Sequence, residues 1–151
     1  LATGGVWVGE KDLLPGVIEN LTGNVLFHGI RVKPGMPTML SVVEDIPVLS
    51  LSGNPFAVAA LFELLAGGYL ADRAEEVYTQ KKETKVLRQT FVKTGKPKRI
   101  VKGKCDEEGV FLPQIQRNGQ LKNGIGSNCL VVFPEGERTY PEGEKVQVIR
   151  I

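Results

Sequence analysis

Residues that can hold an anion and a divalent cation stand close together near the start of the sequence. The segment Thr3–Asp12 reads Thr-Gly-Gly-Val-Trp-Val-Gly-Glu-Lys-Asp and directly precedes an expected helix. Glycines let the backbone come close to a ligand, and a helix N-terminus offers unpaired N–H groups to an anion. The carboxylates of Glu10 and Asp12 suit a cation that bridges to phosphate. A tight turn closed by Asp12 as a helix cap has the same spacing, so that interpretation stays open.

Two later loops contain residue types of the same kind. In Val32–Pro37, two prolines and a glycine fix a non-helical backbone, and Lys33 supplies a point charge suited to phosphate or another oxyanion. An ordinary surface turn has the same composition. In Ser52–Pro55, a glycine turn is followed by a good capping residue and by a proline at the first helical position. Open α/β sheets bind ligands at the carboxyl ends of their strands, so the three loops are expected to converge on one crevice.

The elements that must position these loops alternate between strand and helix. The apolar spacing predicts a helix over residues 13–21, capped by Asp12 and stopped by Gly23. A second helix is expected from Phe56 to Ala66, ended by Gly67–Gly68. Strands are predicted at three apolar runs, residues 25–27, 39–43 and 47–51. This alternation is typical of an α/β layered unit.

The second half of the chain has a different composition. Residues 1–76 carry four basic and nine acidic residues, a net charge of −5, whereas the remainder carries 15 and eight, a net charge of +7. Its apolar runs predict short strands at residues 86–92, 99–102, 110–115, 129–133 and 145–151. A length of 151 residues suits one domain or two small ones, and the opposite charges favour two. We expect an α/β domain over residues 1–73 and a small all-β barrel or sandwich over 74–151.

The three loops, in this order, resemble the motifs of a known family. Thr-Gly-Gly-Val-x-Val-Gly-x-x-Asp at 3–12, Lys-Pro-Gly-x-Pro at 33–37 and Gly-Asn-Pro-Phe-Ala at 53–57 are similar to those of the molybdopterin molybdenumtransferases, which include the C-terminal domain of gephyrin. The resemblance covers essentially the whole chain. It implies that residues 1–73 are the C-terminal half of a three-layer α/β molybdopterin-binding domain. It also implies that residues 74–151 are the family's C-terminal all-β domain, within a longer protein.

The resemblance implies a cytoplasmic transferase that inserts molybdate into adenylylated molybdopterin with Mg²⁺ and releases AMP. By matching position, the catalytic residues are Asp12, which lies at the metal with Glu10, and Lys33, which holds molybdate or the pterin phosphate. A metal and a fixed cation both stabilise charge in phosphoanhydride cleavage. The implied substrate-binding residues are Thr3, Gly4, Gly5, Gly9, Lys33, Pro34, Gly35, Ser52, Gly53, Asn54 and Pro55. The implied partners are the pterin substrate, other domains of the same protein and, in the full-length form, a second copy.

Three positions depart from the family pattern. Trp7 stands where the pattern has a serine, Met36 where it has a second lysine, and Ser52 where it has a proline. These changes leave an alternative open, a catalytically degenerate module that binds a pterin or mediates assembly. The family also has N-terminal regions with further acidic residues of the site, so this chain alone is not expected to be a complete enzyme.

Other features of the composition exclude several classes of function. His28 is the single histidine, so no His-based metal site or catalytic triad is expected. Cys105 and Cys129 do not make a disulfide framework, which suits a reducing cytosol. No apolar run of about 18 residues predicts a membrane helix. The run Lys81–Lys104 has ten basic residues against one acid, but Phe91 is its one aromatic, which argues against nucleic-acid binding and favours a solvated strand face.

Overall fold

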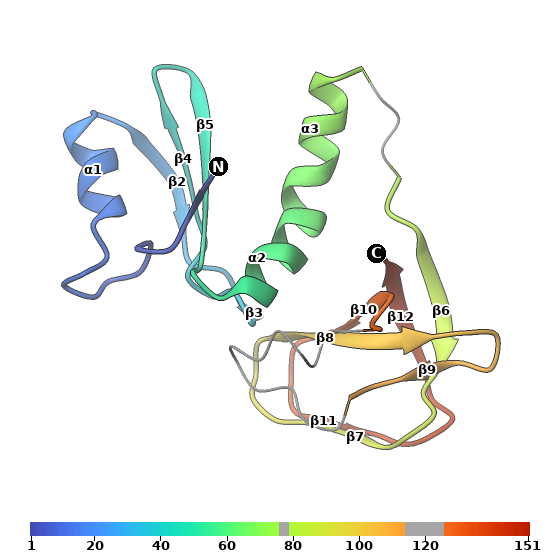
Figure 1. Ribbon diagram of the computed structural model, residues 1–151. Coiled ribbons are helices and arrows are strands. Elements are labelled where there is room, and N and C mark those ends of the chain that lie inside the picture. Colours follow the sequence, from blue (N-terminus) through green and yellow to red (C-terminus); the bar gives the residue numbers. More distant parts are fainter. Residues whose placement is uncertain (76–78, 114–125) are drawn as a thin grey trace. The chain divides into compact units, whose positions relative to one another are not determined.

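The computed structural model describes residues 1–75, 79–113 and 126–151 (Figure 1). The chain divides into two compact units, Leu1–Ala66 and Gly67–Ile151, and each is described by itself. The sequence places its boundary seven residues later, after Arg73. The two boundaries differ because a continuous helix, Pro55–Arg73, runs across the division between the units.

The first unit is built on a four-stranded sheet with the order β1 (Ala2–Thr3), β5 (Ile46–Leu51), β4 (Met39–Val43) and β2 (Asn24–His28). Strands β1 and β5 are parallel, whereas β4 pairs antiparallel with both β5 and β2. The three strands predicted in this half are confirmed. The sequence does not predict β1 or the equally short β3 (Val32–Lys33), because two residues are too few to show an apolar alternation.

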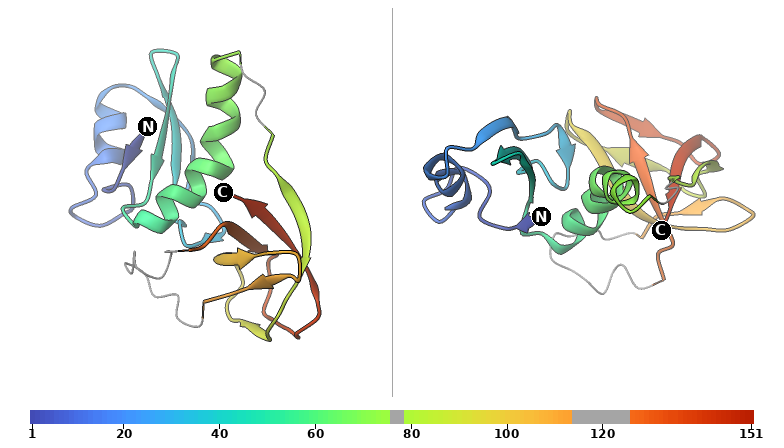
Figure 2. Two further views of the ribbon diagram at one scale, coloured as in Figure 1. Left: turned by 45° about the vertical axis from the view of Figure 1, so that its right-hand side comes forward. Right: turned by 90° about the horizontal axis from the view of Figure 1, so that it is seen from above.

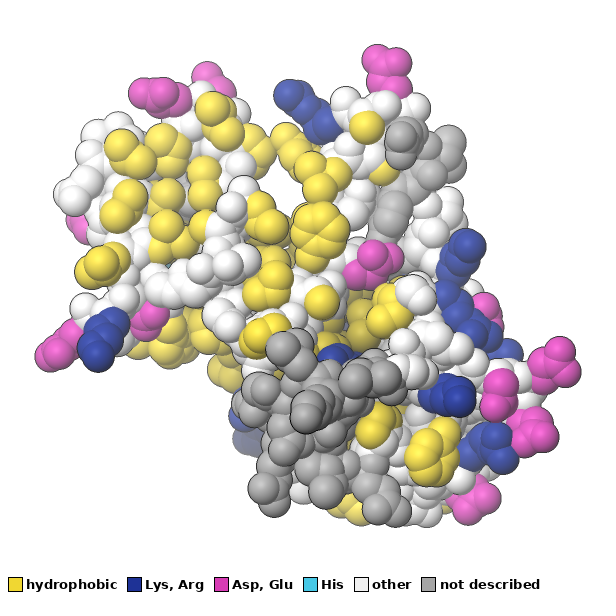
Figure 3. All heavy atoms as spheres, in the orientation of Figure 1, with side chains coloured by type: hydrophobic (Ala, Val, Ile, Leu, Met, Phe, Trp, Pro, Cys, Tyr) yellow, Lys and Arg dark blue, Asp and Glu magenta, His cyan; other side chains and the backbone are white. Residues whose placement is uncertain are grey.

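Helix α1 (Leu14–Asn20) is attached to this sheet by a small apolar core. The core consists of Val6, Ile18 and Met39, with Leu14, Val43 and Val48 packed against them. A seven-residue helix is too short to be stable alone, so this packing is what holds α1 in place. Hydrophobic side chains also gather on the surface of the first unit (Figure 3), where Leu26 and Phe27 of β2 are exposed.

The helix after β5 is longer than the sequence predicts. It consists of α2 (Pro55–Leu61), a π-helical turn labelled η1 (Phe62–Ala66), and α3 (Gly67–Arg73). The predicted end at Gly67–Gly68 is wrong, because neither glycine adopts the positive φ angle with which a glycine terminates a helix. Both are therefore accommodated in the helix at a cost of about 1 kcal/mol each relative to alanine.

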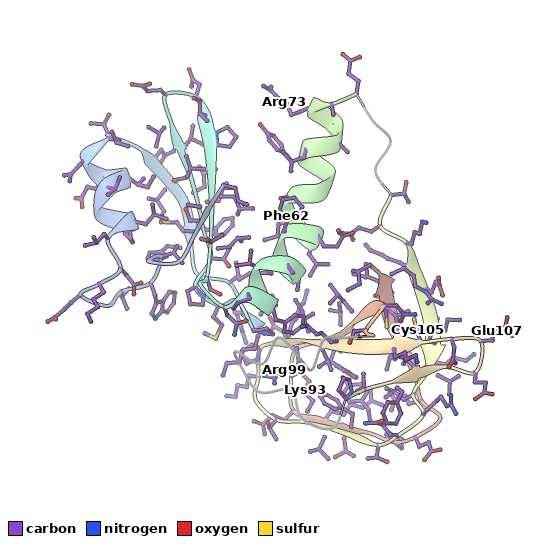
Figure 4. The ribbon with its side chains drawn as sticks, in the orientation of Figure 1. Phe62, Arg73, Lys93, Arg99, Cys105 and Glu107 are labelled. Carbon is purple, nitrogen blue, oxygen red and sulfur yellow. The ribbon has the colours of Figure 1, made fainter. Side chains whose placement is uncertain are left out.

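The continuous helix also bears on the expectation about membrane spans. The 19-residue span Pro55–Arg73 is long and apolar enough to cross a bilayer by length and mean composition, although Glu63, Asp72 and Arg73 interrupt its apolar residues. The core helix of a soluble protein passes the same test. Ala57, Ala60 and Leu61 of this span are buried, whereas Phe62 is exposed (Figure 4). Length and composition alone therefore assign this helix to neither environment.

The second unit is rich in β-structure (Figure 2). Its strands in the described residues are β6 (Lys82–Val86), β7 (Phe91–Lys93), β8 (Lys98–Cys105), β9 (Val110–Phe111), β10 (Cys129–Phe133), β11 (Arg138–Tyr140) and β12 (Lys145–Arg150). Four of them form an antiparallel sheet in the order β8-β10-β12-β6, while β9 pairs with β8 and β11 with β7. The strand order in the described residues is open, so a closed barrel is not confirmed.

Three of the five strands predicted in this half are found with small changes at their ends, namely β8, β10 and β12. The predicted strand over 86–92 is wrong, because the chain leaves the sheet after Val86 and Leu87 donates its N–H to the Glu144 carbonyl. The strand predicted over 110–115 ends at Phe111, and its last two residues lie outside the described residues.

An aromatic cluster links the two sheets of the second unit. Phe133 of β10 is fully buried and stacks on Phe91 of β7 with ring centroids 4.5 Å apart. Tyr140 of β11 lies 4.7 Å from Phe133 on another side. Buried aromatic pairs contribute about 0.5–1.5 kcal/mol beyond the burial of their area. The strand pair β7–β11 is therefore held to the larger sheet mainly by these three rings.

Substituting Gly35 is expected to destabilise the first unit. A Cβ at Gly35 would lie 2.3 Å from Leu61 Cδ1, and its φ angle of +114° is one that L-residues rarely adopt. We expect Gly35→Ala to lower the free energy of unfolding by about 3 kcal/mol. Urea unfolding followed by the fluorescence of Trp7, the one tryptophan of the chain, reports on this unit.

Gly16→Ala is the matched control, because a Cβ at Gly16 in α1 would have no atom within 4 Å. Replacing a helical glycine by alanine should leave stability unchanged or raise it by up to about 1 kcal/mol. Equal effects of the two substitutions would contradict the close packing described for Gly35.

Candidate functional site

The first and third loops meet through their backbones. The Gly4 N–H donates to the Leu51 carbonyl at 2.9 Å, which extends the parallel pairing of Thr3 with Leu51. A Cβ built on Gly53 would lie 3.5 Å from the Cα of Gly4. Gly4 and Gly5 have φ angles of +81° and +61°, so glycine is the residue that fits this turn with least strain. The expected convergence of these two loops is therefore a direct contact.

The second loop reaches the third through helix α2. Gly35 is buried, and its Cα faces the Leu61 and Ala57 side chains of α2, the helix that Asn54 caps. Thr38 Oγ1 donates to the Gly35 carbonyl at 2.7 Å and fixes the far end of this loop. Lys33 is exposed, and among the described residues its ammonium group has no ion-pair partner. The loop is thus rigidly attached, while its one cation stays available to a ligand.

The third loop confirms its predicted cap. Asn54 Oδ1 accepts hydrogen bonds from the N–H groups of Phe56 and Ala57, at 3.0 and 3.1 Å. Pro55 occupies the first turn of α2, as the sequence predicts. Ser52 Oγ lies 3.4 Å from the Asn54 N–H, which donates to it. Because two N–H groups of the first turn are already bonded to Asn54, this helix start has fewer free donors for an anion than expected.

Asp12 does not cap α1. The N-cap position of that helix is Leu13, which makes no side-chain cap, and Asp12 Oδ2 instead accepts from the Gly9 N–H at 2.9 Å. The Asp12 N–H in turn donates to the Gly9 carbonyl at 2.9 Å. The predicted cap is wrong because Asp12 closes the four-residue turn before the helix. This turn holds one Asp12 oxygen and leaves the other without a hydrogen-bond partner in the described residues.

The residues expected to hold a metal ion are Glu10 and Asp12 of the first loop. In the described part of the chain, no group of three or more His, Cys, Asp or Glu side chains is placed to hold one. Mg²⁺ is usually bound by one or two carboxylates together with water and substrate phosphate. The unpaired oxygen of Asp12 and the exposed Glu10 carboxylate fit that smaller requirement. The role of Glu10 and Asp12 as ligands of a metal ion stays a prediction.

The aromatic ring of Trp7, in the first loop, contacts that of His28, and the sequence does not predict this pairing. The ring of His28, in β2, lies 5.6 Å from that of Trp7 at an interplanar angle of 80°. His28 Nε2 donates to the Val6 carbonyl at 2.6 Å. Trp7 and His28 are 21 positions apart, so no local pattern in the sequence relates them. The one available signal is that both residue types occur once in the chain.

The second unit contains a buried lysine and two buried thiols (Figure 4). Lys93 is 2% exposed, and its Nζ donates to the carbonyls of Gly95 and Gly136. Cys105 and Cys129 are free and buried; burial above all, with a hydrogen bond to Cys105, raises the pKa of Cys129 to about 12. A buried thiol with a raised pKa is a poor nucleophile, and Cys129 belongs to the hydrophobic core of the second unit.

The basic run of the second unit is partly neutralised. Arg88 pairs with Asp106 at 3.5 Å and with Glu108 at 2.8 Å. Arg150 donates to both oxygens of Glu83, and this hydrogen bond lowers the pKa of the Glu83 carboxyl and raises that of Arg150. The carboxylates of Asp106 and Glu108 therefore offset the charge of Arg88, whereas Arg150 lies outside the run and neutralises Glu83, the single acid of the run.

Comparisons with known proteins find a similarity that covers the first unit. Residues 1–72 match the family model of a probable molybdopterin binding domain. This class agrees with the α/β sheet and with the three loops that approach one another around it.

The same comparisons relate the whole chain to longer proteins. It is 32% identical over 148 residues to a putative molybdopterin biosynthesis protein of Methanocaldococcus jannaschii, covering 98% of this chain and 35% of that protein. It is 30% identical over 160 residues to the molybdopterin molybdenumtransferase of Bacillus subtilis, covering 100% of this chain and 36% of that protein. The chain thus spans about one third of the length of these relatives.

Solved structures give the same relationship. The crystal structure of the Pyrococcus horikoshii molybdopterin biosynthesis protein MoeA aligns over 98% of this chain and 36% of its own, with a TM-score of 0.79 and 28% identity. A molybdenum cofactor biosynthesis protein from Pyrococcus furiosus aligns over 85% of this chain and 45% of its own, with a TM-score of 0.68 and 27% identity. The chain is therefore a partial relative of the molybdopterin molybdenumtransferases.

Removing the Asn54 side chain should loosen the third loop. Asn54→Ala deletes an acceptor shared by two N–H groups, and we expect it to lower the free energy of unfolding of the first unit by about 1 kcal/mol. Asn54→Asp keeps an oxygen acceptor and should retain most of the stability. Urea unfolding followed by Trp7 fluorescence measures both, and an unstable aspartate variant would contradict a simple capping role.

Proposed function

We propose that this chain provides part of the site at which molybdate is inserted into adenylylated molybdopterin with release of AMP. The observation that carries the proposal is the backbone contact of Gly4 with Leu51 and Gly53, which brings the first and third loops together. The relationship to proteins named molybdopterin molybdenumtransferase supports the same activity.

The residues of the three loops have different proposed roles, which follow from their chemistry. Lys33 is an exposed cation without an ionic partner in the described residues, and in this proposal it holds molybdate or the pterin phosphate. The glycine turns at Gly4, Gly5 and Gly53 let the backbone approach the phosphates, and Gly9 keeps the Asp12 carboxylate in its turn. Thr3, Pro34, Gly35, Ser52, Asn54 and Pro55 complete the loops as substrate-binding residues.

Asp12 and Glu10 would hold Mg²⁺ in this proposal. When bound, the ion stabilises negative charge that develops as the phosphoanhydride bond breaks. The part of Asp12 in this arrangement is to present one oxygen toward the ligand, because the other is fixed by the Gly9 N–H at 2.9 Å. The proposal includes cytoplasmic location and a homodimer in which other domains of the protein contribute the rest of the site.

A second candidate function is a pterin-binding or assembly module without catalysis. Two observations favour it: Trp7 and Met36 stand where the resemblance implies a serine and a lysine. Losing an ammonium group beside Lys33 lowers the positive charge available to an oxyanion. Binding of the pterin without AMP release would identify this alternative.

Release of AMP from adenylylated molybdopterin, in the presence of molybdate, tests the proposal in the polypeptide that contains this chain. We expect Lys33→Ala to lower the molybdate-dependent rate about 100-fold, because it removes a fixed charge from the transition state. Lys81→Ala, an exposed lysine of the second unit, is the matched control and should keep the full rate. An unchanged rate in Lys33→Ala would overturn the assigned role of Lys33.

A further inference from the structure

The single tryptophan of the chain is held at the surface of the first glycine loop. Trp7 is 38% exposed, although tryptophan is usually buried unless its ring has a partner outside the chain. The preceding residue, Val6, is 2% exposed and belongs to the core beneath α1. The loop therefore presents an aromatic ring next to a buried residue, in the same segment of chain as Gly4, Gly5 and Gly9.

His28 fixes the position of this ring from the neighbouring strand. Its Nε2 donates to the Val6 carbonyl at 2.6 Å, and its ring meets that of Trp7 edge to face. This hydrogen bond ties β2 to the residue adjoining Trp7, so the indole is held by a tertiary contact as well as by its own loop. A preorganised aromatic ring loses little conformational freedom when a ligand binds to it.

Gly29 leaves room for the indole and connects it with the second loop. A Cβ at Gly29 would lie 3.3 Å from Trp7 Cζ3 and 3.4 Å from Cη2, and the φ angle there is +100°. The same Cβ would lie 3.9 Å from the Met36 carbonyl oxygen, and the neighbouring Ile30 N–H donates to that oxygen at 3.0 Å. Gly29 thus contacts the indole of the first loop and lies close to the backbone of the loop that contains Lys33.

We propose that Trp7 stacks on the planar heterocycle of the ligand and so determines which ring the site accepts. The inference rests on the proposed function, in which the glycine loops and Lys33 bind phosphate or molybdate. A phosphorylated pterin and an adenylyl group share this chemistry, since both join a flat nitrogen heterocycle to a phosphate. An exposed indole at the edge of a phosphate site supplies the π-face on which such rings stack.

The indole N–H of Trp7 gives a direct readout, because a chain with one tryptophan has one indole cross-peak in a ¹⁵N NMR spectrum. Three probes are titrated into the 151-residue chain: 6-hydroxymethylpterin and adenosine, which carry a ring without a phosphate, and inorganic phosphate. We expect a ring-bearing probe to shift the indole peak and phosphate to leave it unmoved. The probe that shifts it at the lower concentration identifies pterin or adenine as the stacked ring.

Two variants distinguish the effect of losing the Trp7 ring from an effect of misfolding. Trp7→Ser, which restores the residue implied by the family pattern, should weaken binding of the ring-bearing probe about tenfold, whereas Trp7→Phe should stay within about threefold of the original chain. Affinity for inorganic phosphate should be the same in all three. Backbone amide spectra check that each variant is folded.

The outcomes distinguish this inference from the function on which it rests. If a ring-bearing probe shifts the amides of Gly4 and Gly53 but not the indole, or binds equally to Trp7→Ser, stacking by Trp7 is wrong and the site remains. If no probe shifts any of these signals, this chain does not bind the ring by itself, and stacking by Trp7 in this chain is wrong. A shifted indole together with an unchanged AMP release rate in Lys33→Ala would support stacking and overturn only the role of Lys33.

Discussion

The parallel pairing of β1 with β5 is the constraint on which the candidate site depends. It joins residues 2–3 to residues 50–51, and the Gly4 N–H continues the pairing to the Leu51 carbonyl at 2.9 Å. Because β1 and β5 are parallel, the first and third loops both begin at the same edge of the sheet. The close approach of Gly53 to Gly4 then excludes side chains from the junction. A two-residue strand thus determines how two of the three loops that we assign to the ligand are placed, the first and the third.

The second loop joins this arrangement by packing rather than by strand pairing. Gly35 lies against Leu61 and Ala57, so the helix that Asn54 starts is also the support for the loop that contains Lys33. The cap at Asn54 and the packing of Gly35 therefore both stabilise helix α2. Loss of either is expected to move a loop of the site, although neither residue needs to touch the ligand. A substitution that destabilises the first unit at these positions is therefore expected to change the geometry of its site as well.

Local signals in the sequence predicted most of the elements. Apolar runs located β2, β4 and β5, and the Asn54–Pro55 pair located the start of α2, because these features depend on neighbours within a few residues. The same rules failed at Asp12 and at Gly67–Gly68. Asp12 had a good capping residue type but formed a turn with Gly9, and the two glycines continued a helix without the positive φ angles that would have ended it. Propensity is a weak guide wherever two local structures compete for the same residue.

The sequence by itself determined the family resemblance and the residue types of the site: the glycine turns, one lysine and two carboxylates, in a recognisable order. The tertiary structure decided which of them meet. It brings Gly4 close to Gly53 and packs Gly35 against α2. It also fixes one oxygen of Asp12 in a turn and brings Trp7 into contact with His28 and Gly29. Contacts between residues tens of positions apart depend on strand pairing and core packing. No periodicity or spacing along the chain encodes such contacts directly.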